Sequence, residues 1–328
     1  MNRVPILLSA ILAALVLALA ACGGDDEEGG TPAGGGEPTP AGEAPGNAIQ
    51  ADPANKGKTL TIGSKNFTEQ YILGEIYAQA LEAAGFTVKK QQDLGSEQIA
   101  FKALKGGDID AYPEYTGTAL TSFYKVKTAD VPRDKDKSFQ QLQEDLKADD
   151  ITAMPQTPFE NTYKIAGTKE IADKLGNPKT LSELVKAGGN KYRLSAFPEC
   201  RQRTDCLVGL QDTYGFDPKF VSSQGQYADL EAGEAEFTTG FSTDGQLATG
   251  KYVVFDDDKG LYPPYYVSLL TRNDAVEKLG ESGQAVIEQV QEPLTNEVMA
   301  ELNSRVAIDK QEPEQVAADY LKEAGLTQ

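Results

Sequence analysis

Two patterns alternate along residues 59–118, which read TLTIGSKNFTEQYILGEIYAQALEAAGFTVKKQQDLGSEQIAFKALKGGDIDAYPEYTGT. Short apolar runs at 59–63, 86–88 and 109–112 predict strands. Between them, over 68–84 and 98–105, apolar residues recur at helical spacing. The order β-α-β-α-β is typical of a mostly parallel sheet that is covered by helices. Ligands of such sheets bind beyond the carboxyl ends of the strands, where Lys65 and residues 112–118 lie.

The alternation continues after a polar helical stretch at 138–149. Strands are predicted at 151–154, 192–195, 236–241 and 252–255, and the stretch 263–270 leads into a last strand. Helices are predicted at 181–187, 207–214, 228–233, 283–305 and 313–324. We therefore expect an α/β protein with two lobes. Residues 59–159 and 262–328 would form lobe 1, residues 160–261 would form lobe 2, and a ligand cleft would lie between them.

The first residues have the features of an export signal: Arg3, an apolar core at 6–20, and Leu19-Ala20-Ala21-Cys22. The core is short for a spanning helix, which needs ~20 apolar residues. The last four residues resemble the lipobox of bacterial lipoproteins. This resemblance implies that residues 1–21 are a signal peptide and that Cys22 carries a lipid. Residues 22–58, rich in Gly, Pro, Ala and acidic residues, are predicted to be a disordered linker. We expect the chain to face the extracytoplasmic side of the cell membrane, attached by the lipid alone.

Composition excludes several function classes. The formal net charge of −19 argues against nucleic acid as a partner, which would require a basic patch. The absence of histidine removes Ser-His and Cys-His catalysis and histidine-ligated metals, so no metal and no cofactor are expected. A hydrolase that works with two carboxylates needs no histidine and stays an alternative. Glu114 with Asp244 is the pair that such an enzyme would use.

Two cysteines remain besides Cys22, and they lie close together at Cys200 and Cys206. Outside the cytoplasm, such a pair predicts a disulfide. A metal site is the rival interpretation, but two thiolates without a histidine make a poor one. The disulfide would hold Arg201 and Arg203, which lie between the cysteines, in a fixed conformation.

Several motifs, taken in order, resemble those of the substrate-binding proteins of ABC importers for glycine betaine, carnitine and choline. They are Gly63-Ser64-Lys65-Asn66-Phe67-Thr68-Glu69-Gln70, Tyr112-Pro113-Glu114-Tyr115-Thr116-Gly117-Thr118, Asn161-Thr162-Tyr163, Ser242-Thr243-Asp244-Gly245 and Pro263-Pro264-Tyr265. The resemblance covers residues 59–328. It implies a type II periplasmic-binding-protein fold, whose two α/β lobes close over the ligand. It also implies a binding protein rather than an enzyme, which captures a quaternary ammonium osmoprotectant and delivers it to an ABC permease.

The resemblance further implies the residues that bind the ligand. An aromatic box for the quaternary ammonium would consist of Tyr115, Tyr163, Phe241 and Tyr265. The ligand's carboxylate would be held by Lys65, Thr118 and Arg203, and Asn161 would place its backbone carbonyl near the methyl groups. Aromatic rings suit this ligand because they attract a cation that has no N–H group to donate.

Alternatives remain at several of these positions. Phe241 stands where relatives often have tyrosine, Tyr266 could replace Tyr265 through a shift of one residue, and Arg201 competes with Arg203. Glu97 could face the cation, which would favour choline over betaine. A binding protein of the same fold for another small solute, such as an amino acid, is the main alternative function.

Overall fold

The computed structural model describes residues 48–328. The predicted signal peptide, Cys22 and most of the predicted linker lie outside the described residues. The end of the linker differs from the expectation, because Pro53–Asn55 form a short 3₁₀ helix (η1). The Asn55 side chain is buried and donates a hydrogen bond to the carbonyl of Ala84 at 3.0 Å. The ordered domain therefore begins before Thr59.

The predicted β-α-β-α-β order of the N-terminal segment is confirmed. It comprises β1 (Thr59–Gly63), α1 (Thr68–Ala83), β2 (Thr87–Gln91), α2 (Glu97–Gly106) and β3 (Ala111–Tyr115). The first sheet has the order β2-β1-β3-β10-β4. Strand β1 is parallel to β2 and β3, but β10 (Val267–Arg272) is antiparallel to β3 and to β4 (Ile151–Ala153). The sheet is thus mixed rather than mostly parallel, because the chain re-enters it from the opposite end after the second sheet.

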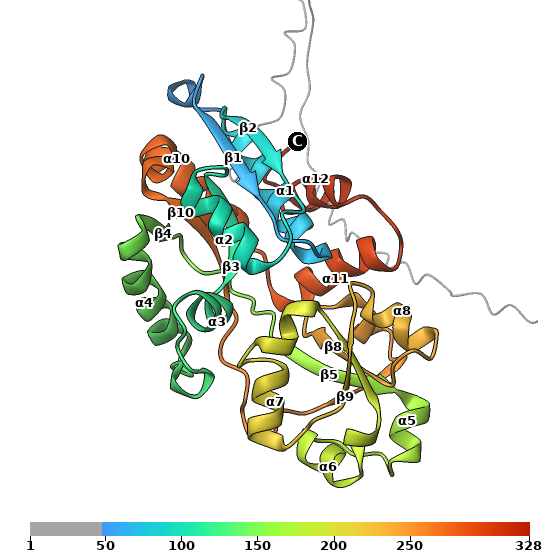
Figure 1. Ribbon diagram of the computed structural model, residues 1–328. Coiled ribbons are helices and arrows are strands. Elements are labelled where there is room, and N and C mark those ends of the chain that lie inside the picture. The colour runs from blue at the N-terminus through green and yellow to red at the C-terminus, as the bar shows by residue number, and fades with distance from the viewer. Residues whose placement is uncertain (1–47) are drawn as a thin grey trace, which may run out of the picture. The chain divides into compact units, whose positions relative to one another are not determined.

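A second mixed sheet has the order β7-β6-β8-β5-β9. Its strands are β5 (Tyr163–Thr168), β6 (Arg193–Ala196), β7 (Lys219–Ser222), β8 (Phe237–Phe241) and β9 (Tyr252–Phe255). Strands β7 and β8 flank β6 in parallel, and β8 and β9 flank β5 in antiparallel. Figure 1 shows each sheet with its own helices. The predicted two-lobe α/β architecture is therefore confirmed, although the sequence patterns missed β5 and β7.

The remaining helices surround these sheets. They are α3 (Thr116–Thr118), the π-helical turn η2 (Ala119–Phe123), α4 (Lys135–Leu146), α5 (Lys169–Lys174), α6 (Leu181–Lys186), α7 (Leu207–Tyr214), α8 (Gln226–Glu231), α9 (Gly245–Ala248), α10 (Asn273–Gln291), α11 (Asn296–Ala307), α12 (Pro313–Glu323), and the 3₁₀ helices η3 (Thr128–Asp130), η4 (Lys147–Asp149), η5 (Gly189–Lys191) and η6 (Pro198–Gln202). The single helix predicted at 283–305 is wrong. Pro293 interrupts the pattern, and the Thr295 side chain caps a new helix by accepting from the backbone N–H of Val298.

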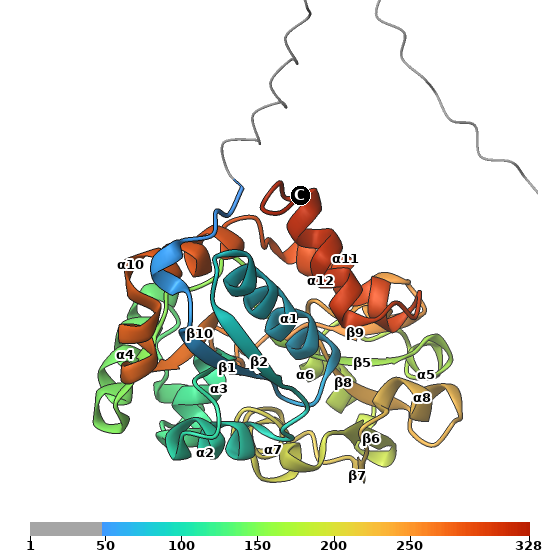
Figure 2. The ribbon, with the colours of Figure 1, turned by 90° about the horizontal axis from the view of Figure 1, so that it is seen from above.

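Two chain crossings and one helix connect the lobes. The crossing after β4 and the crossing after β9 run side by side, with Glu160 and Tyr266 in an antiparallel bridge. The connecting helix is α11, which packs against α9 of the second lobe and against α1 of the first, and α12 packs against α1 beside it (Figures 1 and 2). At the contact of α11 with α9, a Cβ on Gly245 would lie 2.6 Å from the Cα of Ser304, so glycine allows the close approach. Within residues 48–328, no helix is long and apolar enough to cross a membrane.

Candidate functional site

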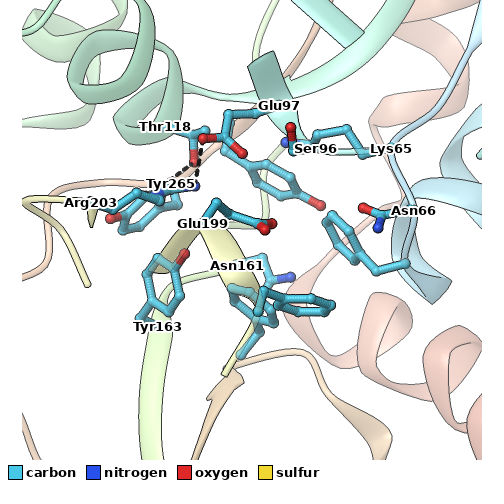
Figure 3. A pocket seen from close by; sticks show the side chains of 14 residues that line it. Lys65, Asn66, Ser96, Glu97, Thr118, Asn161, Tyr163, Glu199, Arg203 and Tyr265 are labelled. Carbon is cyan, nitrogen blue, oxygen red and sulfur yellow. Dashed lines mark hydrogen bonds and ion pairs between the residues drawn. The ribbon is translucent and has the colours of Figure 1, made fainter. Parts of the chain in front are cut away.

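A cavity opens where the carboxyl end of β3 faces β5 and β8. Every residue predicted for the aromatic box and for the carboxylate contacts lines this cavity, together with residues that the sequence did not indicate (Figure 3). The lining residues are Lys65, Asn66, Phe67, Ser96, Glu97, Tyr115, Thr118, Asn161, Tyr163, Phe197, Glu199, Arg203, Phe241 and Tyr265. The structure therefore brings the predicted residues together, while their roles in binding stay predictions.

Six of the fourteen residues that line the cavity are aromatic. We define the aromatic cluster as the rings of Phe67, Tyr115, Tyr163, Phe197, Phe241 and Tyr265. Tyr163 lies 4.9 Å from Phe241 and 5.8 Å from Tyr265, measured between ring centroids. Phe67 stacks between Phe241 at 5.9 Å and Tyr115 at 6.1 Å. The rings thus form a continuous aromatic surface that spans both lobes.

Phe67 and Phe197 were missed by the sequence analysis. Phe67 lies within the quoted motif 63–70, directly after Lys65 and Asn66, and that position was the available signal. Phe197 precedes the cysteine loop, and its ring lies 6.5 Å from those of Phe67 and Phe241. No pattern in a single sequence marks such a ring as part of the cavity.

Strand ends and the second chain crossing position the residues that were predicted for the aromatic box. Tyr115 ends β3, and Phe241 ends β8, where it pairs in register with Tyr163 at the start of β5. Tyr265 comes from the second crossing and packs against Gly117, where a Cβ would meet the Pro264 carbonyl at 2.8 Å. Tyr266, the alternative to Tyr265, does not line the cavity, and Lys135 Nζ lies 5.4 Å from its ring centroid.

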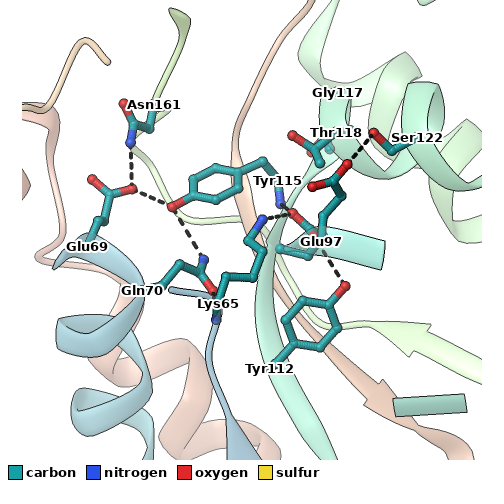
Figure 4. A network of polar contacts seen from close by, with 12 residues as sticks. Lys65, Glu69, Gln70, Glu97, Tyr112, Tyr115, Gly117, Thr118, Ser122 and Asn161 are labelled. Atoms are coloured by element: carbon teal, nitrogen blue, oxygen red, sulfur yellow. Dashed lines mark hydrogen bonds and ion pairs between the residues drawn. The ribbon is translucent and has the colours of Figure 1, made fainter. Parts of the chain in front are cut away.

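Lys65 reaches the cavity but already has a carboxylate partner. Its Nζ forms a buried ion pair with Glu114 and lies 4.5 Å from the ring centroid of Tyr115 (Figure 4). Glu114 also accepts hydrogen bonds from the Tyr112 hydroxyl at 2.9 Å and from the Tyr115 backbone N–H at 2.8 Å. This network fixes both Lys65 and the end of β3.

Arg203 is held in the same manner. Its Nε and Nη2 donate to the two carboxylate oxygens of Asp205 at 2.8 and 2.6 Å, and Nη2 lies 3.3 Å from Thr118 Oγ1. Burial would raise the pKa of Asp205, but the Arg203 guanidinium and the Tyr265 hydroxyl outweigh burial and hold that pKa below its ordinary value. The guanidinium carbon lies 5.6 Å from the Tyr163 ring centroid. Arg203 therefore contacts both the polar and the aromatic parts of the cavity.

The cysteine loop carries Arg203 into this position. A disulfide joins Cys200 and Cys206, both buried, and the segment that it closes includes most of η6. Arg201 lies in the same loop but does not line the cavity, since its guanidinium carbon sits 4.6 Å from the Phe220 ring centroid. The choice that the sequence left open between Arg201 and Arg203 is thus resolved in favour of Arg203 as the lining residue.

Two glutamates line the cavity as well. Glu97 starts α2, accepts from Ser122 Oγ at 3.3 Å and lies 3.7 Å from Arg203 Nη1. Glu199, which the sequence analysis missed, is half-buried, and burial raises the pKa of its carboxyl. The sequence had indicated Glu97 as a residue that could face a cation, and the structure places it at the cavity.

Glu69 lies behind the aromatic cluster and binds groups from both lobes. Its carboxylate accepts from Tyr115 Oη at 2.8 Å and from Asn161 Nδ2 at 2.9 Å (Figure 4). It also accepts from Asn303 Nδ2 at 2.9 Å and from Thr243 Oγ1. Burial raises the pKa of this carboxyl, and the hydrogen bonds offset part of the rise. Asn161 is therefore tied to the same network through its side chain.

The carboxylate pair of the hydrolase alternative does not line the cavity. Glu114 is paired with Lys65, and Asp244 accepts from Tyr227 Oη at 2.7 Å and from the Phe241 backbone N–H at 2.9 Å. Asp244 instead borders a neighbouring groove. Across residues 48–328, no group of three or more Cys, Asp or Glu side chains is arranged to hold a metal ion.

Comparison with known proteins places the chain in a family. Residues 58–323 match the family described as the substrate binding domain of the ABC-type glycine betaine transport system. The chain is 30% identical over 281 residues to a glycine-betaine-binding protein of Pseudomonas aeruginosa, a match covering 82% of this chain and 88% of that protein. The solved structure of a glycine betaine/carnitine/choline ABC transporter has a TM-score of 0.63 at 27% identity, covering 80% of this chain and 98% of that structure.

A further relative is named for a different ligand. The chain is 30% identical over 287 residues to the ergothioneine transport permease/ergothioneine binding protein EgtU of Helicobacter pylori. The match covers 86% of this chain and 49% of that protein, so the chain spans about half of its length.

Proposed function

The chain belongs to the family of substrate-binding domains of ABC-type glycine betaine transport systems, and from this premise we propose that it captures glycine betaine or a close quaternary ammonium relative and delivers it to an ABC permease. The observation that carries the proposal is the aromatic cluster, which lines a cavity between the two lobes. In this role the chain catalyses no reaction.

The chemistry of the ligand explains the aromatic cluster. A trimethylammonium group is positive, weakly hydrated and unable to donate an N–H hydrogen bond. Each ring face attracts such a cation by ~0.5–2 kcal/mol when water is excluded. A carboxylate alone would attract lysine or sodium as well, so the rings supply the selectivity for a methylated nitrogen.

Individual residues have the following proposed roles. Tyr115, Tyr163, Phe241 and Tyr265 form the walls of the box, with Phe67 and Phe197 completing it. Arg203 and Lys65 hold the carboxylate of a betaine with the donors that their acidic partners leave free, and Thr118 does so with its hydroxyl. Asn161 offers its backbone carbonyl to the methyl groups. The buried pairings of Lys65 and Arg203 support this assignment because they orient both cations before the ligand arrives.

We further propose how the chain is organised at the cell surface. Residues 1–21 serve as a signal peptide, Cys22 carries a lipid, and a linker holds the domain outside the membrane. The lobe boundaries are those expected from the sequence, at 59–159 with 262–328 and at 160–261. These assignments are supported by the lipobox-like residues and by the chain crossings before β5 and after β9.

Calorimetric titration with a panel of ligands tests the function. The panel contains glycine betaine, carnitine, choline, proline betaine and ergothioneine, with glycine as the unmethylated control. We expect micromolar or tighter binding of at least one methylated compound, and no comparable binding of glycine. Tyrosine fluorescence gives a second signal, since the chain has 14 tyrosines and no tryptophan. The absence of heat with every methylated ligand would refute the proposal, and tight binding of glycine would favour an amino-acid-binding protein.

A pair of variants ties binding to the cavity. Tyr115→Ala removes a ring of the aromatic cluster, and Tyr266→Ala removes a neighbouring ring that does not line the cavity. Only the first should weaken binding, by about tenfold or more if one ring contributes at the upper part of its range. Equal losses in both variants would place the ligand elsewhere.

Choline is the second candidate ligand. Glu97 and Glu199 line the cavity, and among residues 48–328 the 3.7 Å contact of Glu97 with Arg203 is the only ion pair that either acid forms. Such acids favour a ligand with a net positive charge over a zwitterion. In the same panel, choline binding tighter than glycine betaine would select this alternative.

A further inference from the structure

The hydrogen bonds around Tyr115 have a defined direction. The backbone N–H of Lys65 donates to Gln70 Oε1 at 3.1 Å, which turns the Gln70 amide so that Nε2 faces the Tyr115 hydroxyl at 3.3 Å. An amide nitrogen only donates, so the tyrosine oxygen accepts this bond. The tyrosine proton is then directed to Glu69, whose Oε1 lies 2.8 Å away (Figure 4).

The other contacts of Glu69 also favour its ionised form. Asn161 Oδ1 accepts from the Thr243 backbone N–H, which directs Asn161 Nδ2 to Glu69 as a donor. Asn303 Nδ2 lies 2.9 Å from both the Thr243 carbonyl and Glu69, so it is a donor as well. A carboxylate that receives these donors is hydrogen-bonded in the way an anion requires.

The ionised form of Glu69 lacks a cation, and burial accordingly raises the pKa of this carboxyl. Glu69 is 2% exposed, and in the part of the chain that the structure describes no lysine or arginine forms an ion pair with it. Four other buried carboxylates have a basic partner: Glu114 pairs with Lys65, Asp205 and Glu97 pair with Arg203, and Glu75 pairs with Lys90. An isolated buried charge is costly unless a counter-charge approaches it. The aromatic cluster is where a cationic ligand would supply that charge.

Glu69 does not line the ligand cavity, and the Tyr115 ring stands between the two. A phenol that donates to a carboxylate carries more electron density in its ring, and its face then attracts a cation more strongly. We propose that Glu69 is the buried counter-charge of the ligand's quaternary ammonium group and that it acts through the hydroxyl of Tyr115, as a positioning residue without ligand contact. The proposal rests on the proposed function.

Tyr265 provides a matched control within the same cluster. Its hydroxyl donates to Asp205 at 2.7 Å, so it also links a ring of the cavity to a buried carboxylate. The charge of Asp205 is already balanced by Arg203, which the charge of Glu69 is not. Loss of the Tyr265 hydroxyl should therefore change the attraction for a cation less than loss of the Tyr115 hydroxyl.

The test compares a charged ligand with an uncharged isostere. Glycine betaine and 3,3-dimethylbutanoate have the same shape, but a neutral carbon replaces the ammonium nitrogen in the second. The dissociation constants of both are measured by calorimetry and by NMR titration for the wild type, Glu69→Gln, Tyr115→Phe, the double variant and Tyr265→Phe. For a protein that prefers choline, choline and 3,3-dimethylbutan-1-ol replace them.

We expect Glu69→Gln and Tyr115→Phe each to weaken betaine binding by about tenfold, the scale of one cation–π contact. The double variant should bind betaine no more weakly than either single variant, because both changes remove the same interaction between Glu69 and the Tyr115 hydroxyl. Neither change should alter binding of the isostere by more than about threefold. Tyr265→Phe should show a smaller difference between the two ligands.

Two results would overturn the inference. Equal weakening of the charged ligand and the isostere would mean that Glu69 only shapes the site, and losses that multiply in the double variant would mean that it acts by another route. If Glu69→Gln does not fold, which thermal unfolding would reveal, Tyr115→Phe with the two ligands decides alone. A wild type that binds no quaternary ammonium compound would refute the proposed function itself, and this inference with it.

Discussion

Replacing Asp205 with asparagine should destabilise the protein more than any surface change. Asp205 is fully buried, Arg203 is 9% exposed at its side chain, and the pair is joined by two hydrogen bonds. The variant keeps the shape of the side chain but leaves the guanidinium buried, with Glu97 at 3.7 Å as its nearest anion. Breaking a buried pair in this way costs about 3–5 kcal/mol, which corresponds to a fall in Tm of roughly 6–20 °C for a domain of this size.

The chain contains an exposed copy of the same geometry, which serves as the control. Arg272 and Asp274 have the same spacing, and Arg272 Nε donates to Asp274 Oδ1 at 2.9 Å. Their side chains are 28% and 50% exposed, and exposed pairs contribute only about 0–1 kcal/mol. Calorimetric unfolding at pH 7 should therefore separate Asp205→Asn clearly from Asp274→Asn. If the two variants unfold within about 1 kcal/mol of each other, the buried pair does not stabilise this fold as reasoned.

The pH dependence gives the same prediction a second test. The pKa of Asp205 is lowered in the folded state, so its contribution to stability is present above the unfolded pKa of about 3.9 and is lost as the pH falls through the folded value. The difference in Tm between the wild type and Asp205→Asn should be constant from about pH 5 to pH 8 and should shrink below about pH 4. A difference that grows on acidification would contradict the direction of the shift.

Three further outcomes are expected. Tyr163→Ala should weaken ligand binding by about tenfold or more in calorimetry, whereas Tyr163→Phe, which keeps the ring beside Phe241, should bind within about threefold of the wild type. Similar losses in both variants would show that the hydroxyl matters rather than the ring. Gly117→Ala should lower the free energy of unfolding by about 1–3 kcal/mol because its Cβ would lie 2.8 Å from the Pro264 carbonyl. Gly106→Ala in α2 should be neutral or stabilising because the nearest atom to its Cβ would be Asp108 Oδ2 at 3.7 Å; the reverse order would refute the packing argument. Burial raises the pKa of Asp244 to about 7, so its contribution to stability is fully present below the unfolded-state pKa and is lost as the pH rises from about 4 to 7. Asp244→Asn should reduce this slope of stability against pH in urea unfolding, and an unchanged slope would assign it to other groups.

Periodicity predicted the elements that alternate cleanly and missed those that do not. The N-terminal β-α-β-α-β order follows from apolar residues at strand and helix spacing, and it is observed. Strand β7 (Lys219–Ser222) pairs only with β6 at the sheet edge, and its residues are exposed or half-buried, so it lacks an apolar run. Strand β5 (Tyr163–Thr168) is central, but its Ala166 and Gly167 are small, and a Cβ on Gly167 would lie 2.9 Å from the Phe237 ring. Packing against a neighbour, rather than local propensity, forms both strands.

The same distinction holds at the site. Tyr115, Tyr163 and Tyr265 lie within motifs of contiguous residues, and motifs can be recognised in one sequence. Glu69 was also within a motif, yet its partners Thr243 and Asn303 are 174 and 234 residues away, so its role depends on tertiary structure. The sequence alone does not indicate this role, because no local pattern shows that a carboxylate will be buried without a cation.

The arrangement of charge in the cavity fixes how a zwitterion would enter it. Lys65 and Arg203 line the cavity, yet each already faces a buried carboxylate, while Glu97 and Glu199 line it as well. Before any ligand binds, the long-range field of the site is therefore negative, as is the chain as a whole at −19. That field attracts the ammonium end and repels the carboxylate end, so the carboxylate must be held at short range by directional donors such as the Arg203 guanidinium and the Thr118 hydroxyl. A simple carboxylate would meet the repulsion without the compensating attraction of the rings. In the proposed function, the field of the site would select against free anions and the rings would select against unmethylated amines, and each of these filters would be ineffective without the other.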